Sequence, residues 1–429
     1  MVMNTADILT SDPELDADIV LPDEVQPAGG ASTPGTGTIL ITGATGFLGA
    51  ALVEQLVRST DQPIVCLVRP TSELDARSRL QERLTWFGVW RPEWANRVTA
   101  VAGDLAADRL GLAPADYTRL ADDVSLIFHS GAEVHLAYPY RRLRRPNVLG
   151  TREIIRLAAQ GRPKRLCHIS TLSTIDAAVT ETAGGSELAD PAPFGPLELM
   201  STGYARSKWV AEKLIVQAAD RGMDVITIRL GALAGHARTG VSNPNDYAWL
   251  LMAACLHLGS APVLRAPTTW LTVDYVAEAV VALAGTPPID YQPYQVVPRS
   301  AISYADLFSW TRRAGYRLRT IGFARWRATL INAPSGADRS VQAIGSVIPS
   351  DGLPGEAQAH LRSLRTERLL DELGLAPAPL TEEVFGRLLR VGAERGEIPP
   401  PDQPTPGRTA GGRPDDGQVS TQHTERISA

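Results

Sequence analysis

The sequence predicts an α/β protein with a doubly wound parallel sheet, followed by a smaller, mostly helical C-terminal substrate and lid region. Two observations support this fold class. Up to about residue 234, short apolar runs alternate with helical patterns, as expected for strands that are buried on both faces of a parallel sheet. Beyond about residue 235 the pattern is helical and irregular. We therefore predict a sheet domain over 38–234 and the substrate and lid region over 235–397.

The apolar runs themselves locate the strands. They are TILIT (38–42), PIVCLV (63–68), RVTAVAGD (97–104), SLIFHS (125–130), RLCHIST (165–171) and DVITIRL (224–230). Residues 273–285 and 365–374 are the clearest helices of the C-terminal region, part of which we expect to return to the sheet. The ends differ in composition: 1–37 is an acidic lead-in and flexible linker, and 398–429 is Pro/Gly-rich and expected to be disordered.

Composition excludes several classes of protein. The 429 residues carry 42 basic and 47 acidic side chains, and this slightly acidic balance argues against nucleic acid as a partner. The 3 cysteines are scattered, so neither a disulfide framework nor a metal site is expected. The N-terminus has no apolar signal core, and no run approaches the roughly 18 apolar residues of a membrane span. We expect a cytoplasmic protein without a membrane partner.

A glycine-rich turn follows the first predicted strand. In ILITGATGFLGAAL, Gly43 suits the tight turn, Gly46 permits close approach of a pyrophosphate, and Gly49 permits packing of the helix on the strand. The helix N-terminus then offers N–H groups to the phosphates. The spacing is GxxGxxG rather than GxGxxG, so a purely structural turn is the alternative. With a strand before it and a helix after it, the turn predicts a Rossmann-type dinucleotide site.

The second strand indicates which dinucleotide binds. NAD sites usually carry an acidic residue here that binds the ribose 2′-hydroxyl, whereas this strand ends CLVRP with Arg69, and Arg79 follows. A guanidinium forms a charge-assisted pair with a 2′-phosphate. The alternative is a solvated arginine in an arginine-rich chain. The pattern favours NADPH as the cofactor.

A Y-x-x-x-K pair predicts the acid–base chemistry. Tyr204 and Lys208 of YARSK lie four residues apart and therefore on one face of a helix. We expect the lysine ammonium to lower the phenol pKa and to hold the nicotinamide ribose. Upstream, HISTLS offers Thr171 as a hydroxyl for the reacting oxygen, with Ser170 and Ser173 as lesser candidates.

These residues together resemble the extended short-chain dehydrogenase/reductase superfamily. The chain is most similar to one branch, the thioester reductase domains of nonribosomal peptide synthetases and carboxylic acid reductases. The resemblance spans roughly residues 13–401. It rests on GATGFLG, HSGAEVHLAYPYRRLRRPNVLGT (129–151), STGYARSKWVAEKL (201–214), RLGALAGHARTGVSNPND (229–246), WLTVDYVAEAV (270–280), the acidic lead-in PELDADIVLPDEVQP (13–27) and the exit RVGAERGEIPPP (390–401).

The resemblance implies an NADPH-dependent reductase of acyl or peptidyl thioesters bound to the phosphopantetheine arm of a carrier protein. The product is an aldehyde, and a second reduction to an alcohol is left open. The chain contains no adenylation or carrier domain, so the enzyme acts in trans or is part of a larger one. Thr171, Tyr204 and Lys208 are the predicted catalytic residues. The predicted cofactor contacts are Gly43, Thr45, Gly46, Phe47, Leu48, Gly49, Arg69, Arg79, Asp104, Leu105, Ser130, Gly131, Asn147, Ser170, Tyr204 and Lys208.

Two other functions remain open from the sequence: a nucleotide-sugar epimerase or dehydratase, or another extended short-chain reductase, and a cofactor-sensing binding protein without catalysis. The chain departs from the thioester reductase pattern at Leu230, where the family usually has proline, and over 335–360. The arginine run RRLRR (141–145) is either a solvated helix face or a receiving surface for an acidic carrier.

Overall fold

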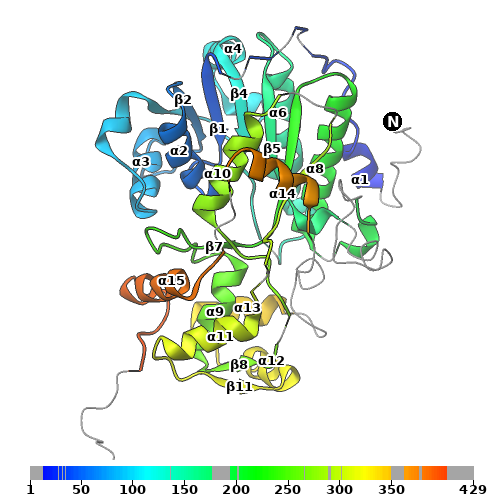
Figure 1. Cartoon of the computed structure of the whole chain (residues 1–429). Helices are drawn as coiled ribbons and strands as arrows, with labels where there is room; N and C mark the ends of the chain where they lie inside the picture. The colour runs from blue at the N-terminus through cyan, green and yellow to red at the C-terminus, as the bar shows by residue number, and fades with distance from the viewer. Residues whose placement is uncertain are drawn as a thin grey trace, which may run out of the picture.

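Two lobes make up the molecule, a sheet domain and a helical lobe below it in the view of Figure 1. The computed structural model describes residues 13–27, 29–30, 32–33, 35–135, 137–175, 194–200, 202–264, 266–287, 291–300, 302–348, 362–375 and 379–402. The first 12 residues, the part of 335–360 from residue 349 on, and the predicted tail from residue 403 on lie outside these ranges.

The sheet domain contains seven parallel strands in the order β10-β6-β5-β4-β1-β2-β3. Because β4 lies beside β1 rather than beside β3, the chain changes direction between these two strands. Ligands bind at such a switch point, at the carboxyl ends of the strands. The strands are β1 (Thr38–Thr42), β2 (Ile64–Val68), β3 (Val98–Ala102), β4 (Val124–His129), β5 (Arg165–Thr171), β6 (Val225–Leu230) and β10 (Tyr294–Val296).

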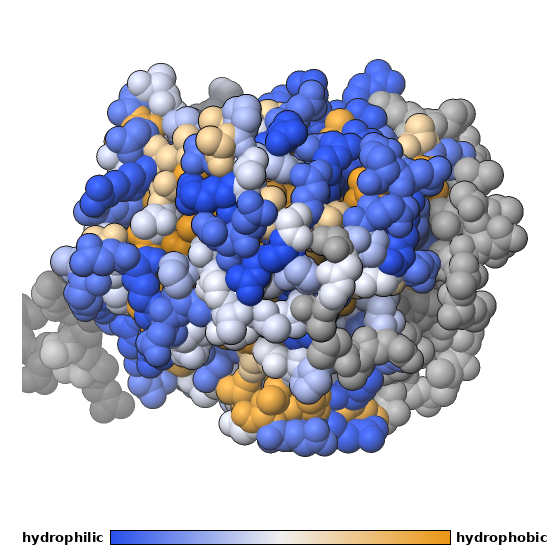
Figure 2. Space-filling model, turned by 90° about the horizontal axis from the view of Figure 1, so that it is seen from above, coloured by the Kyte–Doolittle hydropathy of each residue, from blue (hydrophilic) through white to orange (hydrophobic). Residues whose placement is uncertain are grey.

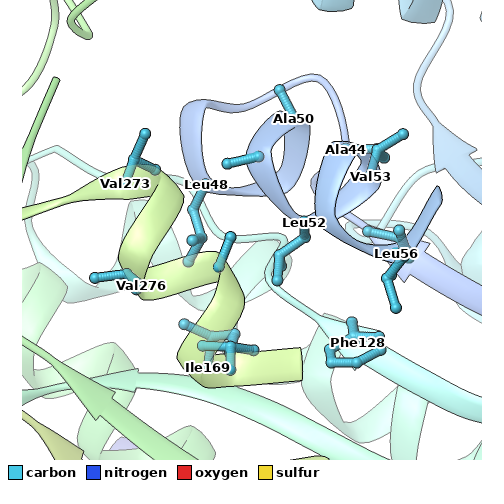
Figure 3. Packing of buried hydrophobic residues seen from close by; sticks show 14 of the residues in the cluster. Ala44, Leu48, Ala50, Leu52, Val53, Leu56, Phe128, Ile169, Val273 and Val276 are labelled. Carbon is cyan, nitrogen blue, oxygen red and sulfur yellow. The ribbon is translucent and has the colours of Figure 1, made fainter. Parts of the chain in front are cut away.

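Apolar helix faces cover both sides of the sheet. On one side α2 and α10 pack together through Leu48, Leu52, Val273 and Val276, above Phe128 of the sheet (Figure 3). On the other side Val210 and Leu214 of α8 belong to the second buried cluster. The helices of this domain are α2 (Phe47–Ser59), α3 (Ala76–Trp86), α4 (Pro114–Asp123), α5 (Tyr140–Arg144), α6 (Gly150–Ala158), α8 (Gly203–Asp220), α10 (Val273–Ala284) and α14 (Leu364–Glu372).

The described part of the lead-in packs against the sheet domain. Helix α1 (Pro13–Asp18) and the residues after it bury four apolar side chains. Arg221, the C-cap residue of α8, donates hydrogen bonds to three backbone carbonyl groups of residues 21–25. Asp18 is buried and binds the Arg144 guanidinium through two contacts of 2.5 Å. The acidic opening is therefore built into the domain through α5 and α8. Its four buried apolar side chains are Leu15, Ile19, Leu21 and Val25.

The helical lobe has a hydrophobic core of its own. Trp326 and Phe385 are fully buried in it, and Trp270 lies between Tyr304 and Phe385. Its elements are β7 (Leu233–Ala234), α9 (Tyr247–His257), β8 (Ser260–Pro262), β9 (Leu271–Thr272), α11 (Tyr304–Arg313), β11 (Arg319–Ile321), α12 (Phe323–Ile331), α13 (Arg339–Val347) and α15 (Glu382–Glu394).

The fold class predicted from the sequence is confirmed, with all six strands of the first half at the expected places. Part of the C-terminal region also returns to the sheet, because β10 pairs with β6 and α10 covers α2. The face seen from above is largely hydrophilic, with smaller hydrophobic areas (Figure 2). Within the described residues, no helix combines the length and the apolar character that crossing a membrane requires.

Candidate active site at the carboxyl edge of the sheet

The glycine turn after β1 excludes a side chain at Gly43 and at Gly49. Gly43 has a φ of +77°, and a Cβ atom there would lie 2.7 Å from the backbone of Gly131. A Cβ atom on Gly49 would lie 2.1 Å from the Gly43 carbonyl oxygen. Gly46 is the N-cap of α2 and supplies no side-chain cap, and the first turn of α2 contains no acidic residue. The free N–H groups and the positive end of the helix dipole therefore remain available to an anion.

Three arginines gather beside this turn. Arg69, at the end of β2, has a side chain that is 64% exposed and lies 4.0 Å from Asp104. Arg79 of α3 donates a hydrogen bond to the Arg69 carbonyl group. Arg83, one turn further along α3, donates to the carbonyl group of Thr45 within the glycine turn at 3.2 Å. Burial lowers the pKa of Arg79 and of Arg83, and each feels a neighbouring arginine. Such a concentration of positive charge suits an anionic ligand.

Further predicted cofactor contacts follow strands β1, β3 and β4. Leu105 packs closely on Gly131 and on Gly150, since a Cβ atom on either glycine would touch it. Asp104 accepts a hydrogen bond from the Ala106 N–H group at 2.9 Å. Phe47 and Leu48 point into the core, which leaves their backbone N–H groups as the groups that can meet a ligand. The structure thus brings the predicted contacts of strands β1 to β4 to one edge.

A buried hydrogen-bond chain connects the ends of β1 and β4 to helix α6. Thr151 donates its hydroxyl proton to the Asn147 carbonyl group at 2.6 Å, so it must accept from His129 Nε2 at 3.0 Å. His129 Nδ1 then accepts from Thr42 at 2.7 Å, and the Thr42 oxygen accepts from the Gly131 N–H group at 3.0 Å. Burial lowers the pKa of His129 to about 3, with Lys208 adding to the effect, so the ring is neutral.

Asn147 continues this chain to the predicted catalytic helix. It is buried on a short π-helical turn, and its amide group donates to Ser207 at 2.9 Å and to the Glu133 carbonyl group at 3.0 Å. Ser207 in turn donates to the carbonyl group of Tyr204 at 2.8 Å. Asn147 therefore holds the first turn of α8 against the loop after β4.

Lys208 is 3% exposed and points toward strand β5. Its ammonium group donates to the Ile169 carbonyl group at 2.6 Å and lies 3.2 Å from His168 Nε2. Burial lowers the pKa of Lys208 to about 8, which the Glu212 carboxylate partly opposes. Burial also lowers the pKa of His168, so this histidine is neutral and accepts the hydrogen bond.

Tyr204 does not have the lowered pKa that we expected from the sequence. Burial raises the pKa of its phenol to about 12, and Asp246 from the helical lobe acts in the same direction. The expectation was wrong because burial desolvates the phenolate, while the Lys208 ammonium group is directed to the Ile169 carbonyl group. The phenol is consequently protonated at neutral pH.

Thr171 ends β5, at the start of a short 3₁₀ turn over Leu172–Thr174. Its side-chain oxygen accepts from the Ser173 N–H group at 3.2 Å, which caps the turn. Ser170 is buried, and its hydroxyl group donates to Glu212 at 2.7 Å. Of the two hydroxyl groups, that of Thr171 is the more accessible.

Two site residues that were not predicted from the sequence lie on the same helix faces as predicted ones. Arg83 follows Arg79 by four residues on α3, and Glu212 follows Lys208 by four residues on α8. Helical spacing was the signal that could have found them. His168 had no such signal, because only the fold places it under Lys208.

Comparison with known proteins identifies the family. Residues 41–280 match the NAD-binding family described as male sterility protein, and the chain belongs to this family. Over 361 residues it is 33% identical to a linear gramicidin synthase chain of Brevibacillus parabrevis, and over 334 residues 37% identical to isonitrile lipopeptide synthase of Streptomyces coeruleorubidus. These stretches cover 84% and 76% of this chain but only 7% and 22% of those proteins.

A solved structure extends the comparison to nearly the whole chain. It is the terminal R domain from the myxalamid PKS-NRPS biosynthetic pathway, with a TM-score of 0.81 and 34% identity. The superposition covers 91% of this chain and 99% of that domain. The resemblance to extended short-chain reductases of the thioester reductase branch is confirmed, and with it a site for a nicotinamide cofactor.

Proposed function

We propose that this protein is an NADPH-dependent oxidoreductase that reduces acyl or peptidyl thioesters on a carrier protein and releases an aldehyde. The single observation that supports this most is the meeting of two groups at one edge of the sheet. An arginine-lined glycine turn lies at β1 and β2, and a protonated tyrosine with a buried lysine lies at β5 and α8. Similarity to the myxalamid R domain over 91% of the chain supports the substrate class.

The residues around the glycine turn fit a dinucleotide phosphate. Because Gly43 and Gly49 have no Cβ atom, the turn packs directly on the backbone of Gly131 and of Gly43 itself, and a pyrophosphate would approach the backbone at Gly46, the N-cap of α2. Arg69 and Arg79 would hold the 2′-phosphate that distinguishes NADPH from NADH, and Arg83 would keep the turn in place through Thr45. The Lys208 ammonium has three N–H groups, so it can reach the nicotinamide ribose while it contacts Ile169 and His168.

When bound, a nicotinamide would supply the hydride for addition to the thioester carbonyl carbon. Tyr204 donates its phenolic proton to the carbonyl oxygen, and Thr171 stabilises the developing oxyanion by a hydrogen bond. The raised pKa of Tyr204 suits this direction, because the acid form is the one required. The resulting hemithioacetal loses the phosphopantetheine thiol and becomes the aldehyde, so one hydride and one proton are consumed.

The carrier protein would approach from the side of α5. Arg141, Arg142 and Arg145 are exposed there, with Arg142 over the Tyr138 ring at 3.7 Å. By its sequence alone, 141–145 could be a solvated helix face or a receiving surface. Leu143 is in fact buried and Arg144 binds Asp18, so the three exposed arginines are the ones that would meet an acidic carrier supplied in trans.

The proposed function is tested by mass spectrometry of products. The purified chain is incubated with several acyl thioesters on a carrier protein and with NADPH, and in parallel with NADH. We expect the aldehyde with NADPH, and the same experiment reports whether an alcohol follows. Turnover of a nucleotide sugar, or no turnover of any thioester while NADPH binds normally, would contradict the proposal.

A further inference from the structure

A buried carboxylate lies beneath the turn that carries Thr171. Glu212 is fully buried on α8, one helical turn beyond Lys208. Its Oε1 atom accepts from Arg229 of β6, with nitrogen-to-oxygen distances of 2.8 and 2.6 Å, and Arg229 is itself 1% exposed. Burying two charges is costly unless each is paired and hydrogen-bonded, so the pair constrains the geometry around it.

The second oxygen of Glu212 holds the two ends of the turn. Its Oε2 atom accepts from Ser170 at 2.7 Å and from Thr174 at 3.2 Å. The single hydroxyl proton of Thr174 is shared between this oxygen and the carbonyl oxygen of Thr171, which lies 2.9 Å away, in a three-centre hydrogen bond. The residue before Thr171 and the residue that closes its turn are therefore attached to one rigid carboxylate, and the backbone of Thr171 is attached through Thr174.

Strand register and apolar packing support the same arrangement. Ser170 and Arg229 are direct partners across β5 and β6, so the ion pair sits at the level where β5 ends. Leu172 and Ile175 of the turn are buried with Val297, which fixes the turn on its other side. Thr171 and Ser173 are the accessible residues of this turn, whose Leu172 and Thr174 are buried.

We propose that Glu212, with Arg229 as its counter-charge, is a positioning residue for the reaction. It holds Thr171 on β5 at a set distance from Tyr204 and Lys208, because those two residues lie on the helix that carries Glu212. This inference rests on the proposed function for one point, that the group which Thr171 contacts is the carbonyl oxygen of a thioester. The role of Glu212 is indirect, acting through Ser170 and Thr174.

The test compares variants with matched controls. Thr174→Val removes the linking hydroxyl group and leaves the ion pair intact. Thr227→Val is its control, since Thr227 is fully buried on β6 and its hydroxyl group contacts Tyr291 at 2.8 Å. Glu212→Gln weakens the ion pair. Its control is Asp224→Asn, which weakens the pair with buried Arg165 at the opposite end of the same strands.

We expect Thr174→Val to lower kcat about tenfold and Glu212→Gln to lower it further, because small displacements of reacting groups are costly. KM for NADPH should change less than about twofold in Thr174→Val, since its hydroxyl group lies away from the glycine turn. The controls should keep kcat within about twofold at similar losses of melting temperature. Equal losses of kcat in variants and controls would overturn the inference.

Hydrogen exchange of the free protein provides a reading that needs no turnover. The N–H groups of Ser173 and Ile175 are bonded within the turn. Both should exchange faster in Thr174→Val and Glu212→Gln than in the parent, and stay unchanged in the two controls. Unchanged exchange in all four variants would overturn the positioning role. Failure of the parent to reduce thioesters would instead overturn the proposed function, so the two failures are distinguishable.

Discussion

The two clusters of charged residues at the carboxyl edge of the sheet, one around the glycine turn and one around β5 and α8, differ in how far they are buried. Around the glycine turn, Arg69 has a side chain that is 64% exposed. Around β5 and α8, Lys208 and Arg229 are 3% and 1% exposed, and both bind groups of the protein itself. An exposed charged side chain that faces a ligand site can be substituted with little loss of folding stability. Buried charges cannot, because their partners would be left unpaired.

The comparison predicts that the largest effect comes from the buried side. Tyr204→Phe should lower kcat by roughly a hundredfold or more, the usual range for a positioned acid. NADPH affinity, followed by nicotinamide fluorescence, should stay near the parent value because the ring remains. Parent-like turnover in this variant would break the proposed mechanism. Loss of NADPH affinity together with kcat would show that the phenol binds the cofactor rather than acting as the acid.

Around the exposed glycine turn, a substitution should change the affinity for NADPH and not kcat. Arg69→Ala removes one charge-assisted contact with the 2′-phosphate, which is worth about 2 kcal/mol, or about thirtyfold in Kd for NADPH. Kd for NADH and the melting temperature should hardly change, because the side chain is largely exposed. Titration of both cofactors into parent and variant measures this. A parallel loss for NADH would place Arg69 elsewhere on the dinucleotide.

The pH dependence should come from Lys208, whose pKa burial lowers to about 8. As pH rises through this value the ammonium is lost, so kcat/KM for NADPH should fall about tenfold per pH unit. Tyr204, with a pKa of about 12, remains protonated throughout. Lys208→Arg should abolish this fall in kcat/KM, because the guanidinium stays charged over the whole pH range. A flat profile of the parent up to pH 9.5 would contradict the assignment.

Over the same pH range in which kcat/KM falls, the contribution of Lys208 to folding stability should rise. This opposite sign distinguishes the loss of activity from unfolding. The folded pKa of Lys208 lies below the usual 10.5, so above pH 8 the unfolded chain binds more protons at this site than the folded one. The contribution of Lys208 to the free energy of unfolding therefore rises from pH 8 to 9.5. Urea unfolding of the parent against Lys208→Met over this range isolates the contribution.

The smallest effect should come from the exposed arginines of α5. Neutralising Arg141, Arg142 and Arg145 should raise KM for a carrier-bound thioester a few-fold and leave a coenzyme A thioester unchanged, since exposed charges contribute little individually. Added salt should reproduce the change. Arg144→Gln is the contrasting variant, because it breaks the buried contact with Asp18 and should lower the melting temperature. Equal losses on both substrates would exclude carrier docking at this surface.

Much of the fold and part of the candidate site could be predicted because their signals are local. The strands are continuous apolar runs, and the glycine turn needs specific residues at specific positions, as the +77° φ of Gly43 shows. Arg69, Thr171, Tyr204 and Lys208 lie at strand ends or on one helix face, where short-range spacing determines position. The resemblance to thioester reductases added the predicted cofactor contacts after β3 and β4.

The tertiary structure alone decided the electrostatics of the site. The pKa of Tyr204 depends on burial and on Asp246, which lies far along the chain in the other lobe. Likewise, the partners of Glu212 come from strands β5 and β6 as well as from the turn after β5. Spacing along the chain tells which side chains share an element. Desolvation and charge pairing depend on distances between elements, and these exist only once the sheet and its helices have packed.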